Sequence, residues 1–517
     1  MTLGTAVAWN TPGILPLKPV SSIDREGARD CSIARLARAP ALQHGMSPAK
    51  HMIPHVIIAG AGPCGLLAAL QLQQAGIKCT IVERAAENRL EADVGSGYDL
   101  SPSSAEVLQR VGLGGTLGAD GVFRGNQAMW VSSTDGTVLR LASLTGEQHA
   151  GYYVASRSKL QRVLLGALRK GAEEADAGAA LMCGYDVVSF DEDEEGVSVK
   201  YRQRGGTAPA STLRGDVLLG CDGVHSAVRK GLHGGGTADG MHFCNAVTWW
   251  GGTELVAGTA LDAAVSSSQA KGDAFLMVTG TRACPGVIVA GITDSTAVDG
   301  GKKVTWAMTM PPEAAKGCAE RVTGGGPAGE DLTRRGGVIG AEAKALAMEA
   351  VGNGGRFVQD LVAGAEESKV TLVGLYDRKD LDLAWTSEGG RVALLGDAAH
   401  PQSPMQGQGV NMALCDAHCV ASRLTAAQQH GGTLPSSLRA YDNADRRRDV
   451  NKIIQKARDV TTWSVSKSPL VTRVMRFAMS SLPLGWIMAE IDSSDVANSN
   501  ALQALEKDIA NLRSQAI

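Results

Sequence analysis

The sequence predicts an α/β protein built around a parallel sheet, and three segments far apart along the chain support this prediction. Each is a short apolar run that ends in a glycine-containing turn before a helical pattern; the runs are residues 56–59, 217–219 and 392–395. Continuous apolar runs of this length are typical of parallel strands that are buried on both faces. The chain of 517 residues also exceeds the length at which one hydrophobic core stops growing, so we expect at least two packed units.

The composition narrows the class of protein. Hydrophobic residues make up 44% of the chain and charged residues 20%, which is ordinary for a soluble globular protein. The net charge is -3 and no long basic stripe is present, so we expect no nucleic-acid partner. The ten cysteines show neither a Cys-x-x-Cys pair nor a metal-ligand spacing. We therefore expect no metal site, and free thiols fit an intracellular, cytoplasmic protein better than a secreted one.

The two ends of the chain carry separate predictions. Residues 1–51 lack apolar periodicity and contain several prolines, so we expect a disordered extension; an organelle-targeting segment is the alternative, because arginines outnumber acidic residues there. No run of 18 apolar residues occurs, which predicts that no helix spans a membrane. The apolar stretch 471–486 contains arginines and a proline, so core-packed helices are favoured over contact of this C-terminal region with a membrane surface.

The ordered part is expected to begin at about residue 52 with a strand–helix–strand unit. The first apolar run is followed by Gly60, Gly62 and Gly65, then by leucines at helical spacing, and a second apolar run ends at Glu83. This is the G-x-G-x-x-G fingerprint of dinucleotide-binding sites. The first glycine permits a tight turn, the second lets a pyrophosphate approach and the third lets helix and strand pack closely, while the later acid binds ribose hydroxyls. We therefore predict a Rossmann-like dinucleotide-binding domain.

Between residues 99 and 233 the pattern alternates between helix and strand. We expect a turn and helix over 99–113, a helix over 156–168, a hairpin over 187–201 and a buried strand at 217–219. This last strand leads into a second turn that contains Asp222 and Gly223, before another helix. Taken alone, an Asp-Gly pair is an ordinary turn. Its position between a buried strand and a helix is what makes Asp222 a candidate.

The chain changes character between residues 234 and 385. Short strand-like pieces precede an alanine-rich helical stretch around 341–350, which we interpret as a second domain built on an antiparallel sheet. The run 392–395 then returns to the first domain, which is therefore discontinuous. The predicted division is residues 52–233 and 386–433 for the nucleotide-binding domain, 234–385 for the inserted domain and 434–517 for a C-terminal helical region. In this last region Arg446, Arg447 and Arg448 are expected to face solvent.

The third turn carries the most specific pattern in the chain. It reads Gly396-Asp397-Ala398-Ala399-His400-Pro401, and after Pro404 it continues as Gly407-Gln408-Gly409-Val410-Asn411, where a helix begins. Backbone N–H groups at such a helix start have no partner within the helix and can receive an anionic or electron-rich ligand. His400 is a candidate general base because imidazole titrates near neutrality, but a supporting role beside the ligand is the favoured interpretation.

Taken together, the three turns resemble those of the single-component FAD-dependent monooxygenases of the aromatic-hydroxylase group, nearest to salicylate-hydroxylase-like and zeaxanthin-epoxidase-like members. Supporting segments are residues 156–161, 375–378 with Trp385, and 441–448. The resemblance covers roughly residues 52–458. The chain departs from it in the inserted domain, where Trp249-Trp250-Gly251 stands in place of the Trp-Arg-Gly of many relatives and where residues 311–340 look inserted.

The resemblance implies an FAD site assembled from distant segments. Asp397 is expected to bond the ribityl chain, Arg157 to reach the cofactor from its helix, and Asp222 to support both flavin and nicotinamide. The helix that begins at Gly409 is expected to face the flavin's pyrimidine ring, where it can stabilise negative charge. The residues expected to bind FAD are Gly60, Gly62, Gly65, Glu83, Arg84, Gly97, Arg157, Asp222, Asp397, Gly407, Gly409, Val410 and Asn411. No catalytic side chain is assigned, because the cofactor carries the difficult chemistry.

The activity implied is hydroxylation or epoxidation of a small organic substrate, aromatic or polyene, with NAD(P)H and O2 through a flavin C4a-hydroperoxide. The inserted domain is expected to hold the substrate, and NAD(P)H is expected to bind transiently because only one dinucleotide fingerprint is visible. Two alternatives stay open: an FAD-dependent reductase or dehydrogenase of an isoprenoid-type substrate, and a non-catalytic protein that uses the FAD fold for binding. Neither the substrate, the choice between NADH and NADPH, nor the oligomeric state follows from the sequence.

Overall fold

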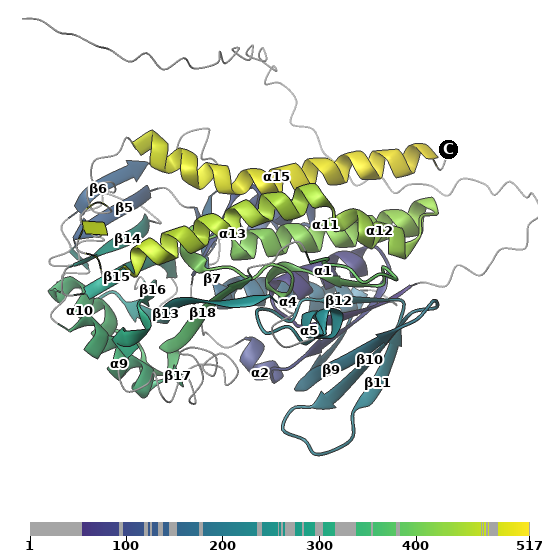
Figure 1. Cartoon of the computed structure of the whole chain (residues 1–517), viewed down its shortest axis with the longest axis horizontal. Coiled ribbons are helices and arrows are strands. Elements are labelled where there is room, and N and C mark those ends of the chain that lie inside the picture. Colours follow the sequence, from purple (N-terminus) through teal and green to yellow (C-terminus); the bar gives the residue numbers. More distant parts are fainter. Residues whose placement is uncertain are drawn as a thin grey trace, which may run out of the picture. The chain divides into compact units, whose positions relative to one another are not determined.

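Five parallel strands form the first sheet of the structure, a computed structural model (Figure 1). They run in the order β19 (Val392–Leu394), β12 (Val217–Gly220), β1 (His55–Ala59), β2 (Lys78–Glu83) and β8 (Ala180–Cys183). Every neighbouring pair is parallel. All residues of β12 and β19 are buried, as parallel strands covered on both faces should be. The three apolar runs are therefore neighbouring strands, and the predicted parallel sheet is confirmed.

The described residues lie between 54 and 515. The gaps are 92–96, 118–121, 125–126, 133–137, 144–151, 175–178, 235–239, 257, 260–261, 264–273, 282–283, 295–302, 316–337, 353–354, 379–382, 467, 469, 472–473 and 475–483. The predicted extension 1–51 lies outside the described residues. So do most of the apolar segment 471–486 and much of the segment 311–340.

Helices follow the strands of this sheet. α1 (Pro63–Gln74) follows β1, α5 (Ala227–His233) follows β12, and α11 (Gly409–His430) follows β19. α1 packs against both α11 and α4 (Arg157–Glu174). Most residues of α1 are buried and belong to one hydrophobic core with the strands, because this helix is apolar on nearly every side. The helix of the turn and helix predicted over 99–113 corresponds to α3 (Pro102–Arg110), although residues 99–100 belong to a strand, and the helix predicted over 156–168 corresponds to α4.

Two small antiparallel sheets accompany the first. One has the order β11-β10-β9, with β9 (Tyr185–Glu192), β10 (Val197–Gln203) and β11 (Ser211–Gly215), and its β9–β10 pair confirms the predicted hairpin. The other has the order β3-β7-β4, with β3 (Gly97–Leu100), β7 (Tyr153–Ser156) and β4 (Val122–Arg124). β3 leads into α3 and β7 leads into α4, while the short α2 (Glu87–Leu90) follows β2.

An eight-stranded sheet forms the second large layer, in the order β17-β18-β13-β16-β15-β14-β5-β6. Its strands are β5 (Gln127–Ser132), β6 (Val138–Ser143), β13 (Met241–Glu254), β14 (Ala274–Thr281), β15 (Cys284–Asp294), β16 (Lys303–Met310), β17 (Val338–Ile339) and β18 (Thr371–Arg378). The described pairs are antiparallel except β14 with β5, which is parallel. β5 and β6 come from the region that the sequence assigned to the nucleotide-binding domain. The sheet thus contains strands from both sides of the boundary predicted at residue 233. β5 pairs with β14 and so covers a strand edge that would otherwise be exposed.

A second hydrophobic core lies between this sheet and two helices, α9 (Ala341–Val351) and α10 (Arg356–Ala363). Trp249 and Trp306 are fully buried in it. The Trp249 indole donates a hydrogen bond to the Ala343 carbonyl (3.1 Å), which ties β13 to α9. Trp249, which belongs to the segment that departs from the family pattern, is therefore part of the sheet's core.

The C-terminal region is helical, as predicted, with α12 (Leu434–Tyr441), α13 (Ala444–Ser464) and α15 (Leu484–Gln515). α15 runs along α11 and also contacts α13 (Figure 1). The prediction that Arg446 faces solvent is wrong: its side chain is 5% exposed, whereas that of Arg448 is 64% exposed. Arg446 lies on the face of α13 that packs against α11 and α15, and a buried aspartate there balances its charge.

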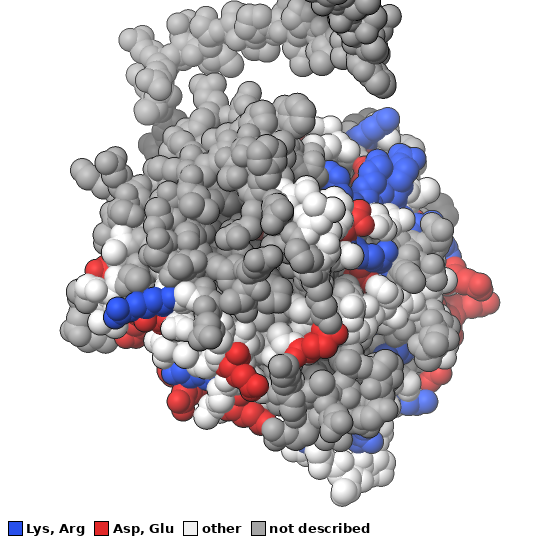
Figure 2. Space-filling view, turned by 60° about the vertical axis from the view of Figure 1, so that its left-hand side comes forward, with Lys and Arg blue, Asp and Glu red and all other residues white. Residues whose placement is uncertain are grey.

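None of the helices among the described residues combines the length and apolar character that a bilayer crossing requires. On the described part of the face shown in Figure 2, basic and acidic side chains lie mixed, and no continuous basic stripe forms.

Candidate active site

Four loops meet at the carboxyl edge of the parallel sheet. In the register of the strands, Ala59 lies beside both Val82 and Gly220, and Gly220 lies beside Leu394. The turns that follow these positions therefore start side by side, since all four strands point the same way. The fingerprint glycines, Glu83, Asp222 and Asp397 are thus brought to one edge from segments more than 300 residues apart in the sequence.

The three fingerprint glycines have different surroundings. Gly60 has a φ of +100°, and a Cβ there would lie 2.5 Å from the Cys221 carbonyl oxygen. A Cβ on Gly65 would lie 2.0 Å from the Gly60 carbonyl oxygen, so only glycine lets α1 pack this closely on its strand. A Cβ on Gly62 would have no atom of the described residues within 4 Å. No side chain caps α1 at Gly62, so the N-terminal end of the helix faces open space and can receive a phosphate.

Glu83 is bonded to the fingerprint loop. Its Oε2 accepts a hydrogen bond from the Ala61 N–H (2.6 Å) and its Oε1 accepts one from the Ala85 N–H (2.7 Å). Gln161 of α4 donates to the Ala61 carbonyl (3.0 Å), which holds the loop from the other side. Each Glu83 oxygen keeps a second lone pair, so the carboxylate can shape the loop and still accept a bond from a ribose hydroxyl. Arg84, the next residue, is exposed.

Asp222 caps the helix that follows it. Its Oδ2 accepts hydrogen bonds from the N–H groups of Ala227 (2.7 Å) and Val228 (3.2 Å) at the start of α5. Its Oδ1 is buried and has no hydrogen-bond partner among the described residues. One oxygen therefore serves the fold, and the other is free for a ligand. Burial raises the pKa of Asp222, although the Ser226 hydroxyl and the helix N–H groups oppose this rise.

Two buried arginines, to which the sequence assigned no role, hold the third turn: Arg229 connects it to the second turn, and Arg378 connects it to β18. The Arg229 guanidinium donates to the Ala398 carbonyl (2.9 Å) and to the Val224 carbonyl (2.6 Å). The Arg378 guanidinium donates to the Ala399 carbonyl (2.7 Å). Both side chains are fully buried. The only sequence signal was their place beside the recognised motifs.

Asp397 lies in a short 3-10 turn, Gly396–Ala398, and faces the start of α11. Its Oδ1 is 3.9 Å from the position that a Cβ would take on Gly409. Burial raises the pKa of Asp397, and the charges of His400, Arg157 and Arg229 oppose this rise. Arg157, an exposed residue at the start of α4, also opposes the effect of burial on the pKa of Tyr98, beside Gly97. Asp397, Arg157 and Tyr98 of β3 are thus close enough for their charges to influence one another.

A buried network of charged side chains holds the third turn in place. Asp416 of α11 accepts bonds from the Gly396 N–H (3.0 Å), from His400 Nε2 (2.5 Å) and from the Arg446 guanidinium (2.9 Å). Burial opposes ionisation of Asp416, but the charges and hydrogen bonds of His400 and Arg446 outweigh it and lower its pKa to about 2. His400 is fully buried in this network, which favours the supporting role over that of a general base.

At the start of α11, backbone N–H groups lie ahead of the first helical hydrogen bond, and the Asn411 side chain is held by hydrogen bonds. The first hydrogen bond within the helix runs from the Met412 N–H to the Gln408 carbonyl, so the N–H groups of Gly409, Val410 and Asn411 precede it. The Asn411 amide is engaged at both ends: its Oδ1 accepts from the Ser101 N–H (3.0 Å), and its Nδ2 donates to the Asp99 carbonyl (2.9 Å). Asn411 can therefore reach a cofactor through its backbone, while its side chain joins α11 to β3.

The fold also brings together three potential metal ligands that the sequence spacing did not suggest. His242 and Cys244 of β13 and Asp377 of β18 have ligand atoms within 4.8 Å of one another. However, Asp377 already accepts a bond from the Arg458 guanidinium (2.6 Å) and lies 3.0 Å from His242 Nδ1. Because a cation at this place would compete with Arg458, we interpret the cluster as a buried ion pair.

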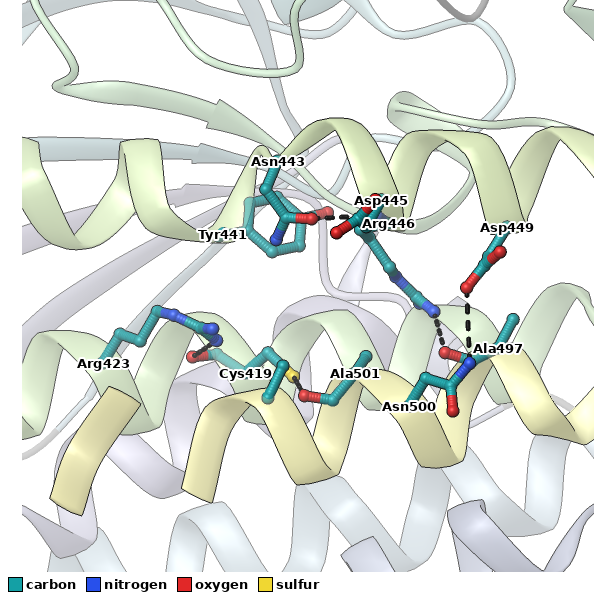
Figure 3. A pocket seen from close by; sticks show the side chains of 11 residues that line it. Cys419, Arg423, Tyr441, Asn443, Asp445, Arg446, Asp449, Ala497, Asn500 and Ala501 are labelled. Atoms are coloured by element: carbon teal, nitrogen blue, oxygen red, sulfur yellow. Dashed lines mark hydrogen bonds between the residues drawn. The ribbon is translucent and has the colours of Figure 1, made fainter. Parts of the chain in front are cut away.

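A small cavity of about 60 Å³ lies between α11, α13 and α15. Figure 3 shows Cys419, Tyr441, Arg446 and Asn500 at its wall, with Arg446 bonded to the Ala497 carbonyl (2.9 Å). Ligand pockets for drug-sized molecules usually exceed about 300 Å³. This cavity belongs to the network that supports the third turn and is too small for a nucleotide.

Comparison with known proteins agrees with the geometry. The sequence model of a family described as FAD binding domain matches residues 54–307 and 381–457. The chain is 30% identical to 3-amino-4-hydroxybenzoate 2-monooxygenase of Streptomyces cremeus, over 86% of this chain and 98% of that protein. It is 27% identical to phenazine 1,6-dicarboxylic acid hydroxylase PhzS of Lysobacter antibioticus, over 79% of this chain and 90% of that protein.

Solved structures share the fold. The crystal structure of Klebsiella pneumoniae HpxO complexed with FAD and uric acid superposes with a TM-score of 0.65 at 21% sequence identity, over 86% of this chain and 97% of that one. The crystal structure of FqzB superposes with a TM-score of 0.62 at 20% identity, over 88% and 95% of the two chains.

Proposed function

The chain belongs to the family of proteins with this FAD-binding domain and is an FAD-dependent monooxygenase of the aromatic-hydroxylase group, and from this premise we propose that it hydroxylates a phenolic aromatic acid with NAD(P)H and O2. The observation that carries the proposal is the meeting of four loops at one sheet edge. The alternative of a non-catalytic binding protein is set aside, because the relatives over most of the chain are named as enzymes.

The residues at this edge fit FAD. The open space at Gly62 and the uncapped start of α1 suit its pyrophosphate, and Glu83 has lone pairs left for the adenosine ribose. Asp397 and the partnerless Oδ1 of Asp222 supply acceptors for the hydroxyl groups of the rest of the cofactor. Asp222 Oδ1 is a buried polar atom without a hydrogen-bond partner among the described residues, and a bound ligand could supply that partner.

Bound FAD supplies the redox chemistry and the activation of O2, which no side chain provides. The protein's own groups orient and stabilise it. The N-terminus of the 22-residue helix α11 carries a partial positive charge and presents free N–H groups, so it can stabilise negative charge on a reduced ring system. The network of Asp416, His400 and Arg446 keeps the turn before α11 in place, and it excludes water because its members are buried.

The substrate class rests on the relatives and on the geometry of the edge. Three of the similar proteins are named as monooxygenases of 3-amino-4-hydroxybenzoate, which is a phenol and a carboxylic acid. The eight-stranded sheet, whose strand β15 contacts both β3 and β7 beside the cofactor edge, is positioned to cover the substrate. We infer an aromatic acid of this type in preference to a polyene.

An oxygen-tracing experiment tests the proposal. The purified protein is expected to be yellow, to oxidise NAD(P)H slowly alone, and to oxidise it faster when 3-amino-4-hydroxybenzoate or a related phenolic acid is added. Under ¹⁸O2 the product should gain one labelled oxygen atom. Stimulated NAD(P)H oxidation with no label in any product would favour the reductase alternative, and the absence of stimulation by every phenolic acid would contradict the proposed substrate class.

A further inference from the structure

Two cysteines from separate elements lie against each other beside the fingerprint loop. Cys64 is in the first turn of α1, directly after Pro63, and Cys221 follows the last residue of β12. In the register of the sheet, Gly220 lies beside Ala59, and the Cys221 N–H donates to the Ala59 carbonyl (2.8 Å). The end of β12 therefore holds Cys221 at the level where the chain leaves β1 and turns into α1.

The two side chains meet at this level. The Cys64 thiol and the Cys221 thiol form a side-chain hydrogen bond, and this bond and burial raise the pKa of Cys64. The Cys64 sulfur also lies 3.6 Å from the position that a Cβ would take on Gly396, in the third turn. The Cys64 sulfur therefore contacts both neighbouring turns, and it keeps its proton in the hydrogen bond to Cys221.

Both thiols are free and can be reached by a small molecule. Each residue is 7% exposed. Gly62, two positions before Cys64, faces open space, since a Cβ there would have no atom of the described residues within 4 Å. FAD bound with its pyrophosphate at Gly62 would cover this approach, so the apoprotein is the form whose thiols are accessible.

A second pair of cysteines shows what geometry a cross-link needs. Cys415 and Cys419 also form a side-chain hydrogen bond, but they lie one turn apart on the 22-residue helix α11. Residues at that spacing have Cβ atoms about 5–6 Å apart, whereas a disulfide requires about 3.5–4.5 Å. Cys64 and Cys221 lie on separate elements, a helix start and a turn, so they can approach one another without distorting a helix.

We propose that Cys64 and Cys221 are a modification site, at which hydrogen peroxide joins them in a disulfide that weakens FAD binding. A flavoprotein monooxygenase releases this oxidant when its reduced flavin reacts with O2 and no substrate is oxygenated. The inference requires the FAD site but not the substrate class proposed above.

The chemistry takes two steps. Because Cys64 keeps its proton, the Cys221 thiolate attacks the peroxide: an S–O bond forms, the O–O bond breaks, and the hydroxide that leaves takes up the proton lost by Cys221. The Cys64 sulfur then attacks the Cys221 sulfenic acid. The S–S bond forms, the S–O bond breaks, and the leaving hydroxide takes the Cys64 proton. The two thiols lose two electrons in total, and one peroxide is reduced to two water molecules.

The disulfide changes the loop that FAD needs. Its sulfur atoms are about 2.05 Å apart, much closer than two thiols in contact, so the start of α1 and the second turn are drawn together. Gly60 lies between them without spare room, because a Cβ there would lie 2.5 Å from the Cys221 carbonyl oxygen. The fingerprint loop must therefore shift, which moves the backbone at Gly62 and the Asp222 carboxyl out of register with the cofactor.

The test treats full-length apoprotein and holoenzyme with hydrogen peroxide, alkylates the remaining thiols and maps the peptides by mass spectrometry. The apoprotein should yield a peptide pair linked through Cys64 and Cys221. Its dissociation constant for FAD, measured by quenching of flavin fluorescence, should rise by roughly tenfold or more. Dithiothreitol should reverse both changes. In the holoenzyme the link should form several-fold more slowly, because FAD covers the approach at Gly62.

Three variants separate this site from general oxidation. Cys64→Ser and Cys221→Ser, each compared with its own untreated protein, should bind FAD equally well before and after peroxide. Cys183→Ser is the control: Cys183 is only partly buried, so it would react first if access alone decided, and this variant should respond as wild type does.

Several results would overturn the inference. They are the absence of the linked peptide, a link that leaves FAD affinity unchanged, or a serine variant of either paired cysteine that loses FAD affinity after peroxide as wild type does. Equal rates of linking with and without FAD would also overturn it. None of these measurements uses a substrate, so a failure of the proposed hydroxylation would be seen separately.

Discussion

The parallel sheet and the eight-stranded sheet differ in how their structure depends on the sequence. At the carboxyl edge of the parallel sheet, short turns determine the geometry. Gly65 is an example: a Cβ at this residue would lie 2.0 Å from the Gly60 carbonyl oxygen, so only glycine fits. In the eight-stranded sheet, large buried side chains such as Trp249 and Trp306 fill the core between strands that are distant in sequence. Sequence motifs therefore reveal the first region, whereas the second is visible only once the strands are paired.

This difference explains why the cofactor is easier to infer than the substrate. FAD is bound by backbone groups and a few acidic residues in turns of fixed spacing. A substrate pocket is lined by side chains from many segments, and their order along the chain carries no regular pattern. The following predictions use substitutions in the two regions to test whether cofactor binding and fold stability separate as this comparison requires.

The largest effect is expected from Asp416→Ala, which should impair both stability and cofactor binding. It leaves the buried Arg446 without its anion and removes the acceptor of the Gly396 N–H, and breaking a buried pair costs about 3–5 kcal/mol. Urea unfolding and the flavin-to-protein absorbance ratio measure the two losses. Asp445→Ala is the control, because Asp445 is 80% exposed and pairs with the exposed Arg448. A variant as stable as this control would contradict the role assigned to the network.

Trp249→Ala should lower stability without lowering FAD affinity. Removing a fully buried tryptophan from a core typically costs about 3–5 kcal/mol. The neighbouring Trp250→Ala provides the control, since Trp250 is only partly buried and should lose less. The protein that remains folded should bind FAD with wild-type affinity. A matching loss of affinity would show that the two regions are not separable in this way.

The variants Gly65→Ala and Gly62→Ala should separate two roles of the glycine motif: the packing of α1 on its strand and the approach of FAD to the backbone. The new Cβ at residue 65 would overlap the Gly60 carbonyl, so the apoprotein should lose about 1–3 kcal/mol and bind FAD poorly. The new Cβ at residue 62 would have no described atom within 4 Å, so the apoprotein should melt like wild type while its FAD dissociation constant rises about tenfold or more. Equal thermal stability of the two apoproteins would argue against this division.

The smallest expected effect is on the pH dependence of apoprotein stability. Because the folded-state pKa of Asp99 is about 7 and the unfolded value is near 4, its contribution is complete below pH 4 and is lost as the pH rises through 7. Asp99→Asn should remove this slope and stabilise the apoprotein at pH 8 relative to wild type. The contribution of Asp416, whose pKa is about 2, runs the other way and is lost only as the pH falls below about 4. Parallel stability curves for wild type and Asp99→Asn between pH 4 and 8 would contradict the assignment for Asp99.

The sequence predicted the α/β class, the parallel strands, the return of the chain at β19 and the FAD-dependent monooxygenase group. The predicted set of FAD-binding residues, from Gly60 to Asn411, stays a prediction, although the fold brings most of it to one edge. The sequence could not show that Arg446 is buried, that Asn411 braces β3, or that β5 and β6 join the second sheet. Each of these depends on contacts between residues at least 30 positions apart, such as Arg446 with Asp416 and Asn411 with Ser101. Local sequence patterns do not predict which distant residues come into contact.

The most direct test of the account is the crystal structure of the holoenzyme. The account predicts that FAD extends along the carboxyl edge of the parallel sheet, with its pyrophosphate at Gly62, its adenosine ribose at Glu83 and its ring system between Asp397 and the start of α11. Electron density for FAD in another place, or a ring system that touches neither Asp397 nor Gly409, would contradict it.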